Sequence, residues 1–346
     1  MEIKDFLLQM DTVPHVSGYE GDLAEVLTAE FAKYAEVSVD KMGNVIALKK
    51  GDGKGPKVLI AAHMDEIGMM VSAVTDEGFV KFSCIGGIDR RNVLAQEVTI
   101  HGREKVFGII GIKPPHLVSA DESKKVIDFF DMAIDTGYSK EKLDKLVRPG
   151  DIITFNTKMA ELKGGKMTGR AMDNIVGVAV MYAAMKNLEF MKHKADVYFV
   201  ATSQEEVGLR GAKVATHTIK PDIGIALDVT FGRTPGLGET DSFELGKGPA
   251  ISVGPGVTRK MFEDLKKAAK KGNTPHQIDV RPRIGGTDAM VIQIGEGGVL
   301  TGDIGIPLKY MHSTNETVQL SDIENGGKLV ADYILSLNSE EDEKCS

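Results

Sequence analysis

The composition is that of an acidic globular protein. The chain has 346 residues, with 42 Lys and Arg against 50 Asp and Glu, so its formal net charge is −8. At about 150 residues per domain, this length predicts roughly two domains. The acidic balance argues against nucleic-acid binding, because contacts to a phosphate backbone require clustered basic side chains.

Membrane insertion and a disulfide scaffold are also disfavoured. No stretch approaches the ~20 apolar residues that span a bilayer, and the N-terminal residues lack the basic-then-apolar pattern of a signal peptide. We therefore expect a cytoplasmic protein with no membrane partner. Cys84 and Cys345 are the only cysteines. They are too few for a disulfide scaffold, so His and carboxylates would have to hold any metal ion.

The first third of the chain combines helical and strand patterns. Apolar residues recur at helical spacing from Phe6, and Ser17 with Glu20 resembles a capping box that starts a second helix. Short apolar runs at 44–48 and 57–62 then predict strands. The second run is apolar throughout, which predicts a strand buried on both faces.

The middle of the chain has a different texture. Short β-rich runs such as 97–100 and 106–110 alternate with turn residues, and the charged stretch 121–125 is expected to be mobile. Helix and strand patterns like those of the first third resume after residue 164. The sequence therefore predicts an α/β fold interrupted by a β-rich insertion at 71–162, the α/β part being residues 1–70 and 163–346.

Five further elements are predicted in the last part of the chain. The final helix begins with Ser321 and Glu324, which resemble a second capping box, and the polar tail 338–346 is expected to be disordered. The predicted helices are 174–188, 258–271 and 321–337, and the predicted strands are 197–201 and 223–227.

Acidic and imidazole side chains recur where these strand patterns end. They are His63 and Asp65, Glu205 and Glu206, Asp228 and His312, with Asp173 at the start of an apolar helix. Because ligands bind beyond the carboxyl ends of the strands in open α/β sheets, these side chains are candidates for one site. Each also has an ordinary interpretation on its own. Asp173 could be a helix cap, and either His could be a structural residue. The Glu pair could belong to a solvated loop, and Asp228 could form a turn.

Taken together, the set favours metal binding. Within this set, two His and three of the carboxylates, with no thiolates, suit a pair of divalent ions such as Zn or Co, with one carboxylate bridging them. Asp65 lies two residues from His63, so its carboxylate could hold the second ring nitrogen of that imidazole. Glu205 and Glu206 offer one side chain for a metal and one for proton transfer.

Six ordered motifs resemble those of the M42 metallo-aminopeptidases, and the resemblance covers nearly the whole chain, including the β-rich insertion. The motifs lie at 62–68 (AHMDEIG), 169–174 (GRAMDN), 203–208 (SQEEVG), 227–229 (LDV), 285–289 (GGTDA) and 311–316 (MHSTNE). The resemblance implies a mixed-sheet sandwich of the zinc-peptidase type as the catalytic domain. It also implies that the insertion is a small β-barrel-like domain for dimerisation or oligomerisation.

The resemblance also implies an activity, a ligand set and an assembly. The enzyme would use two divalent ions, Zn or Co, to remove the N-terminal residue from short peptides with a free N-terminus. Dimers would assemble into a hollow tetrahedral dodecamer. By position, His63 and Asp228 would hold one ion, Glu206 and His312 the other, and Asp173 both; Glu205 would be the general base and Asp65 would orient His63.

Two other functions and the substrate preference stay open. One alternative is an endoglucanase-type glycoside hydrolase, because some related chains carry cellulase-type names. The other is a non-catalytic assembly protein that metal ions stabilise. Glutamyl, leucyl and broad neutral specificity are all compatible with the sequence. The basic residues that could line a pocket for acidic side chains, although surface positions are expected for them, are Arg233, Arg259, Lys260 and Arg283. Thr287 and Asp288 receive no catalytic role.

Overall fold

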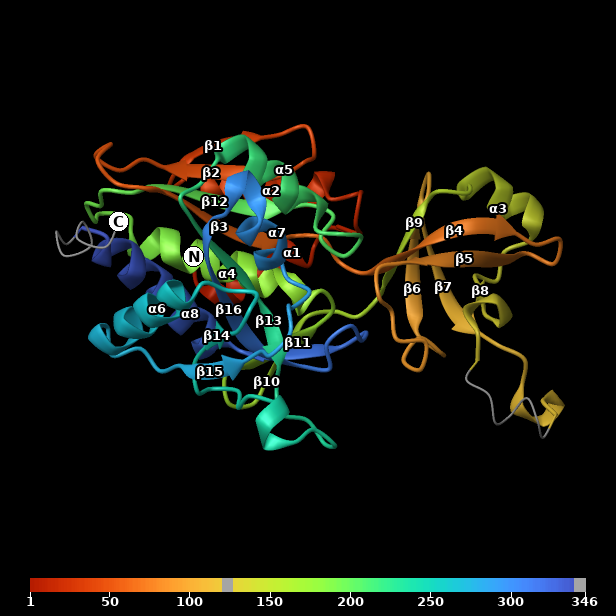
Figure 1. Ribbon diagram of the computed structural model, residues 1–346. Helices are drawn as coiled ribbons and strands as arrows, with labels where there is room; N and C mark the ends of the chain where they lie inside the picture. The colour runs from red at the N-terminus through yellow and green to blue at the C-terminus, as the bar shows by residue number, and fades with distance from the viewer. Residues whose placement is uncertain (120–126, 339–346) are drawn as a thin grey trace.

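The computed structural model describes residues 1–119 and 127–338. They form a large mixed sheet between two layers of helices and a separate closed barrel to one side of it (Figure 1). The stretch 121–125 and all but the first residue of the tail 338–346 lie outside the described residues. The predicted α/β fold with a barrel-like β insertion is confirmed.

The large sheet has 11 strands. Their order is β1-β2-β12-β3-β13-β16-β17-β11-β10, and β14 pairs with both β16 and β15. The strands are β1 (Glu36–Val39), β2 (Val45–Lys49), β3 (Lys57–His63), β10 (Ala160–Leu162), β11 (Lys166–Gly169), β12 (Asp196–Thr202), β13 (Ile223–Phe231), β14 (Ala250–Val253), β15 (Gln277–Val280), β16 (Leu300–Lys309) and β17 (Glu316–Gln319).

The centre of this sheet is parallel. β3 pairs in parallel with β12 and β13, and β13 pairs in parallel with β16. Along β3, Val58 and Ile60 pack into one apolar core and Leu59 and Ala61 into another on the opposite face. Burial on both faces explains the continuous apolar run in the sequence. Because the four strands are parallel, their carboxyl ends meet at one edge of the sheet.

Helices cover both faces of the sheet. One layer contains α1 (Ile3–Met10), α2 (Gly21–Phe31), α4 (Met172–Asn187), α6 (Arg259–Lys271) and α8 (Leu320–Ser336), and the other contains α5 (Arg210–Ile219) and the short α7 (Ala289–Gln293). α4 is buried all round, because it packs against both the sheet and α8. None of the described helices combines the length and hydropathy that crossing a bilayer requires.

The barrel is closed by six antiparallel strands in the order β4-β5-β8-β7-β6-β9. They are β4 (Gly68–Val74), β5 (Phe79–Ile85), β6 (Glu97–His101), β7 (Lys105–Gly111), β8 (Ala133–Asp135) and β9 (Ile152–Phe155), and α3 (Lys140–Leu146) packs beside them. β7 shows the alternation clearly, with Val106 and Ile110 inside and Phe107 and Ile109 exposed.

Three predicted element boundaries are wrong. Ser17 does not cap α2, because its hydroxyl donates to the Asp65 carboxylate instead of accepting from a helical amide. Ser321 does not cap α8, because β17 runs directly into the helix and Gln319 occupies the cap position. The strand predicted to end at residue 227 continues to Phe231.

Candidate metal centre

The predicted site residues come together at the carboxyl edge of the parallel strands. His63 is the last residue of β3, and Asp228 lies level with it on β13, since the register pairs Ala226 with Ala61. The remaining members come from the turn after β12 (Glu205 and Glu206), the start of α4 (Asp173) and the loop after β16 (His312).

The Asp173 carboxylate lies between the two imidazoles. Its Oδ1 is 3.1 Å from Nε2 of His63, and its Oδ2 is 3.3 Å from Nε2 of His312. On the outer sides, Asp228 Oδ1 is 3.8 Å from the same His63 nitrogen, and Glu206 Oε1 is 3.4 Å from that of His312. Each imidazole therefore faces two carboxylates, one of which is shared.

These spacings suit two metal ions. Within each of three groups, the potential ligand atoms lie within 4.8 Å of one another; the groups are His63–Asp173–Asp228, Asp173–Glu206–His312 and His63–Glu205–Glu206. Ligands at the 2.0–2.2 Å bond lengths of zinc are about 3.3–3.6 Å apart in a tetrahedron. The separations of 3.1 to 3.8 Å bracket this range, so small side-chain shifts would bring these atoms to ligand spacing.

The second nitrogen of each ring is held by a backbone carbonyl. Nδ1 of His63 is 3.0 Å from the carbonyl oxygen of Asp65, and Nδ1 of His312 is 2.9 Å from that of Gly87, in the loop after barrel strand β5. Such contacts place the proton on Nδ1 and leave Nε2 free as a ligand. The barrel thus contributes to the orientation of one imidazole.

The side chain of Asp65 makes different contacts from those predicted. Its nearest carboxylate oxygen is 3.7 Å from Nδ1 of His63, further than its own carbonyl oxygen. The carboxylate instead accepts from the hydroxyl of Ser17 and from the backbone amides of Glu205 and Glu206, at 2.6, 2.9 and 3.1 Å. Asp65 therefore fixes the glutamate pair relative to β3.

Asp173 is not a helix cap. It is the second residue of α4, after the cap position Ala171, and its backbone is not helical, with φ −82° and ψ 102°. The peptide bond that follows it is cis. Its amide donates to the carboxylate of Glu316, at 2.9 Å. Glu316 ends the motif at 311–316, but nothing in the sequence pattern predicts its role, because no periodicity marks a residue that binds main-chain atoms.

The site is electrostatically frustrated without cations. Burial raises the pKa of Glu205 to about 9, although the charge of His63 opposes this, and burial also raises the pKa of Asp228 well above its usual range. Hydrogen bonds to Asp173 and Glu206 raise the pKa of His312 to about 11. Burial would lower the pKa of His63, but the charge of Glu205 and neighbouring carboxylates outweighs it and raises that pKa.

A buried ion cluster lies under the ligand-bearing segments. The guanidinium of Arg170, three residues before Asp173, binds the carboxylate of Glu66 and is 3.4 Å from that of Asp11. The side chains of Arg170 and Glu66 are only 9% and 4% exposed. The cluster therefore ties the segment after His63 to the segment before Asp173 through partners that are almost fully removed from water.

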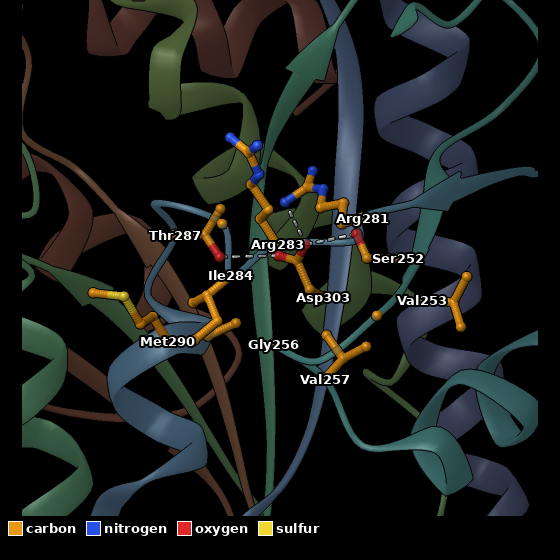
Figure 2. Close-up of a pocket in the computed structure, with 13 residues that line it drawn as sticks. Ser252, Val253, Gly256, Val257, Arg281, Arg283, Ile284, Thr287, Met290 and Asp303 are labelled. Carbon is orange, nitrogen blue, oxygen red and sulfur yellow. Dashed lines mark hydrogen bonds and ion pairs between the residues drawn. The ribbon is translucent and has the colours of Figure 1, made fainter. Parts of the chain in front are cut away.

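A cavity of about 890 Å³ opens beside the candidate ligands. Its wall away from them includes Arg281, whose guanidinium is held between Asp279 (2.7 Å) and Asp303 (2.9 Å). Figure 2 shows a smaller neighbouring pocket that shares Arg281, Arg283 and Thr287 with this cavity. In it, the hydroxyls of Ser252 and Thr287 donate to the carboxylate of Asp303. The larger cavity accommodates the first residue of a peptide and part of the chain that follows it.

Of the four basic residues considered for substrate specificity, one lines the cavity and three do not. Arg283 lines the cavity. Arg233 pairs with Glu239 and Glu244, Arg259 with Glu263, and Lys260 with Asp264, and none of these three lines the cavity.

Asp288 is buried. Its carboxylate accepts a hydrogen bond from the hydroxyl of Thr202 at 2.6 Å, and burial raises the pKa of this carboxyl to about 6.

A mixed sheet whose parallel strands end in two imidazoles and several buried carboxylates, beside a cavity, is an arrangement that could hold metal ions for a hydrolase. The sequence profile of the M42 glutamyl aminopeptidase family matches residues 43–329. The chain belongs to this family and is a peptidase of the aminopeptidase type.

Individual relatives agree with this assignment. The chain is 38% identical over 323 residues to the lysyl aminopeptidase of Pyrococcus furiosus, covering 91% of this chain and 92% of the relative. An aminopeptidase of Desulfurococcus kamchatkensis has a similar structure, with a TM-score of 0.91, 37% identity and coverage of 96% and 94%. The Pyrococcus horikoshii TET1 peptidase, described as assembling into a tetrahedron or a large octahedral shell, gives a TM-score of 0.85 at 34% identity, with coverage of 96% and 99%.

Proposed function

We propose that this protein is a dinuclear aminopeptidase that removes the N-terminal residue from short peptides. The observation that carries the proposal is the position of Asp173, whose two carboxylate oxygens face different imidazoles at 3.1 and 3.3 Å. A carboxylate that offers one oxygen to each of two donor groups is suited to bridge a pair of ions.

The donor set divides between two ions. His63 and Asp228 would hold one ion, Glu206 and His312 the other, and Asp173 both. Nitrogen and oxygen donors without thiolates suit Zn or Co. Two such ions would polarise the scissile carbonyl and lower the pKa of a water molecule, making it nucleophilic at neutral pH.

Glu205 is proposed as the general base. The backbone N–H of Glu205 donates to the Asp65 carboxylate at 2.9 Å. The Glu205 carboxylate lies with His63 and Glu206 in one of the three groups of potential ligands. Glu205 also lines the cavity, where substrate would enter. Its carboxylate would take a proton from the attacking water and pass it to the leaving amine.

The acidic side chains of the site would make the enzyme require a peptide substrate with a free N-terminus. The ammonium group of a peptide would be attracted to the carboxylates that line the cavity next to the imidazoles. An acylated N-terminus carries no charge and adds bulk at this end of the cavity. Cleavage would therefore be confined to the first peptide bond.

Residues 71–162 are proposed as the dimerisation or oligomerisation domain, within dimers that assemble into a dodecamer. On the outer face of the barrel, the register places Phe79, Asp135 and Ile109 in one row, and Phe107 is two residues from Ile109 on the same face. Phe79, Phe107 and Ile109 are 39%, 50% and 45% exposed. A second copy of this chain would cover this mainly apolar strip, in which Asp135 is the one charged member, as the assembly of the Pyrococcus horikoshii relative suggests.

The two alternative functions account for less of the site. Glycoside hydrolysis requires a pair of carboxyl groups and leaves His63 and His312 without a task. A purely structural metal site requires no additional carboxylate such as Glu205 beside its ligands. Both alternatives therefore leave part of the buried cluster unexplained.

The proposal is tested with chelator-treated protein and a panel of aminoacyl p-nitroanilides, assayed without metal and with Zn or Co. The matched controls are the same compounds with an acetylated amino group. We expect metal-dependent hydrolysis of the free amines only. Equal cleavage of the acetylated compounds, full activity without metal, or chelator-resistant cellulose hydrolysis would overturn the proposal.

A further inference from the structure

One buried carboxylate joins two of the candidate ligand segments through their main chains. Glu316 is the first residue of β17 and is only 2% exposed. Its Oε1 accepts the backbone N–H of His312 at 2.8 Å, and its Oε2 accepts that of Asp173 at 2.9 Å. The two segments are far apart in sequence, and this side chain is a direct link between them.

Both amides belong to backbone that regular secondary structure does not stabilise. His312 has a φ of +58°, in the left-handed region that residues other than glycine seldom adopt. Asp173 has non-helical dihedral angles although it lies within α4, and Ala171 before it has a φ of +55°. The left-handed conformations of His312 and Ala171 persist only where their surroundings hold them. The buried hydrogen bonds from the amides of His312 and Asp173 to Glu316 help to hold this backbone.

The Glu316 contacts fix the distance between the side chains of Asp173 and His312. Asp173 and His312 face each other with Oδ2 and Nε2 3.3 Å apart, and both belong to the group that includes Glu206. The other group uses His63 and Asp228, which are held by neighbouring parallel strands. Loss of the Glu316 contacts should therefore affect the two ions unequally.

We propose that Glu316 is a positioning residue that sets the spacing of Asp173 and His312 for the second ion. This inference rests on the proposed dinuclear function. Glu316 acts through main-chain atoms and needs no contact with an ion or with substrate. Its removal should weaken the second ion more than the first, because it displaces both Asp173 and His312 of the second ligand set but only Asp173 of the first. A residue that only stabilises the fold would affect both ions equally or neither.

The test is a calorimetric titration of metal-free protein with Zn²⁺ alone, in wild type and in Glu316→Gln. The Gln side chain has nearly the same shape, but its NH₂ group would face one of the two amide donors, so one hydrogen bond is lost. We expect two ions per chain in wild type. In the variant, affinity for one ion should fall about 10–100-fold and affinity for the other should fall by clearly less.

Asp322→Asn is the matched control. Asp322 is also a fully buried carboxylate that accepts two backbone amides, those of Gly246 and Gly248 at 2.7 and 2.8 Å, but it lies in α8 outside the site. This control should lose stability in the same way and bind both ions as wild type does. Equal weakening in the control, or unchanged Zn²⁺ affinities in Glu316→Gln, would overturn the positioning role.

A second variant covers failure of Glu316→Gln to fold. Glu316→Asp keeps the negative charge but shortens the side chain by about 1.5 Å, so its carboxylate cannot span both amides. It should also lose affinity for one ion, and wild-type affinity would contradict the geometric argument. If wild type itself binds fewer than two Zn²⁺ ions per chain, the dinuclear function fails, which is a different result from a failure of the Glu316 role.

Discussion

Two adjacent glutamates occupy different environments at the residue scale. Glu206 faces the imidazole of His312 at 3.4 Å, whereas Glu205 groups with His63, and burial raises the pKa of its carboxyl to about 9. Their backbone amides are fixed by the same carboxylate, that of Asp65. Substitutions of the two side chains should therefore separate proton transfer from metal binding.

Glu205→Gln should lower kcat by about 10²–10⁴-fold, because the amide cannot accept the proton of water. Its zinc content should stay at the wild-type value, since the proposed ligands are unchanged. Glu206→Gln should lose zinc as well as activity. Metal analysis and steady-state kinetics on both variants check this, and normal turnover in Glu205→Gln would contradict the proposed role.

Metal binding should release protons and strengthen as pH rises. Neighbouring carboxylates raise the pKa values of His63 and His312, the latter to about 11, so the His312 imidazole is positively charged at neutral pH. A ligand must lose this proton to bind, and binding should release roughly one or more protons per chain. Calorimetry in buffers of different ionisation enthalpy measures this number. Release of no protons would contradict the assignment of His312 as a ligand.

The residue types and positions of the site could be predicted from the sequence, but not their contacts. Strand ends and motif spacing indicated which side chains gather at the sheet edge. They could not show that the Asp65 carboxylate binds the amides of Glu205 and Glu206, or that Glu316 binds those of Asp173 and His312. These contacts depend on main-chain positions, which side-chain patterns do not encode.

At the element scale, the site depends on how α4 is joined to the sheet. The segment before α4 carries Arg170, and the segment after β3 carries Glu66; their ion pair holds the two segments together. Continuous apolar runs predicted both elements, because each is buried on all sides. The two capping boxes failed because Ser17 and Ser321 satisfy a generic signature, whereas tertiary contacts decide what occupies a cap.

Arg170→Gln should destabilise the protein by about 3–5 kcal/mol, because it leaves the Glu66 carboxylate buried without its cationic partner. The control is Lys4→Gln, which removes an exposed pair with Glu161 and should leave stability almost unchanged. Chemical unfolding of metal-free protein measures both. Similar midpoints for Arg170→Gln and wild type would refute the importance of the buried pair.

At the scale of the whole molecule, the barrel has both a proposed assembly face and a contact with the site. Its outer strip exposes Phe107 and Ile109, while the carbonyl of Gly87 contacts His312. The change in texture along the sequence predicted a separate β-rich unit. It did not predict the Gly87 contact, because an irregular loop carries no periodic signal.

Phe107→Glu should shift the protein toward smaller species, because it places a charge in the proposed subunit contact. Phe190→Glu is the control, since Phe190 is 90% exposed but lies outside the barrel, in the loop after α4. Light scattering coupled to size-exclusion chromatography gives the masses. An unchanged mass for Phe107→Glu would argue against this strip as a contact.

The central claim is that five side chains from separate segments hold two ions, and anomalous diffraction at the zinc edge tests it most directly. We predict two peaks per chain, one beside His63 and Asp228 and the other beside Glu206 and His312, both in contact with Asp173. A single peak, or peaks away from these side chains in crystals saturated with zinc, would contradict the account.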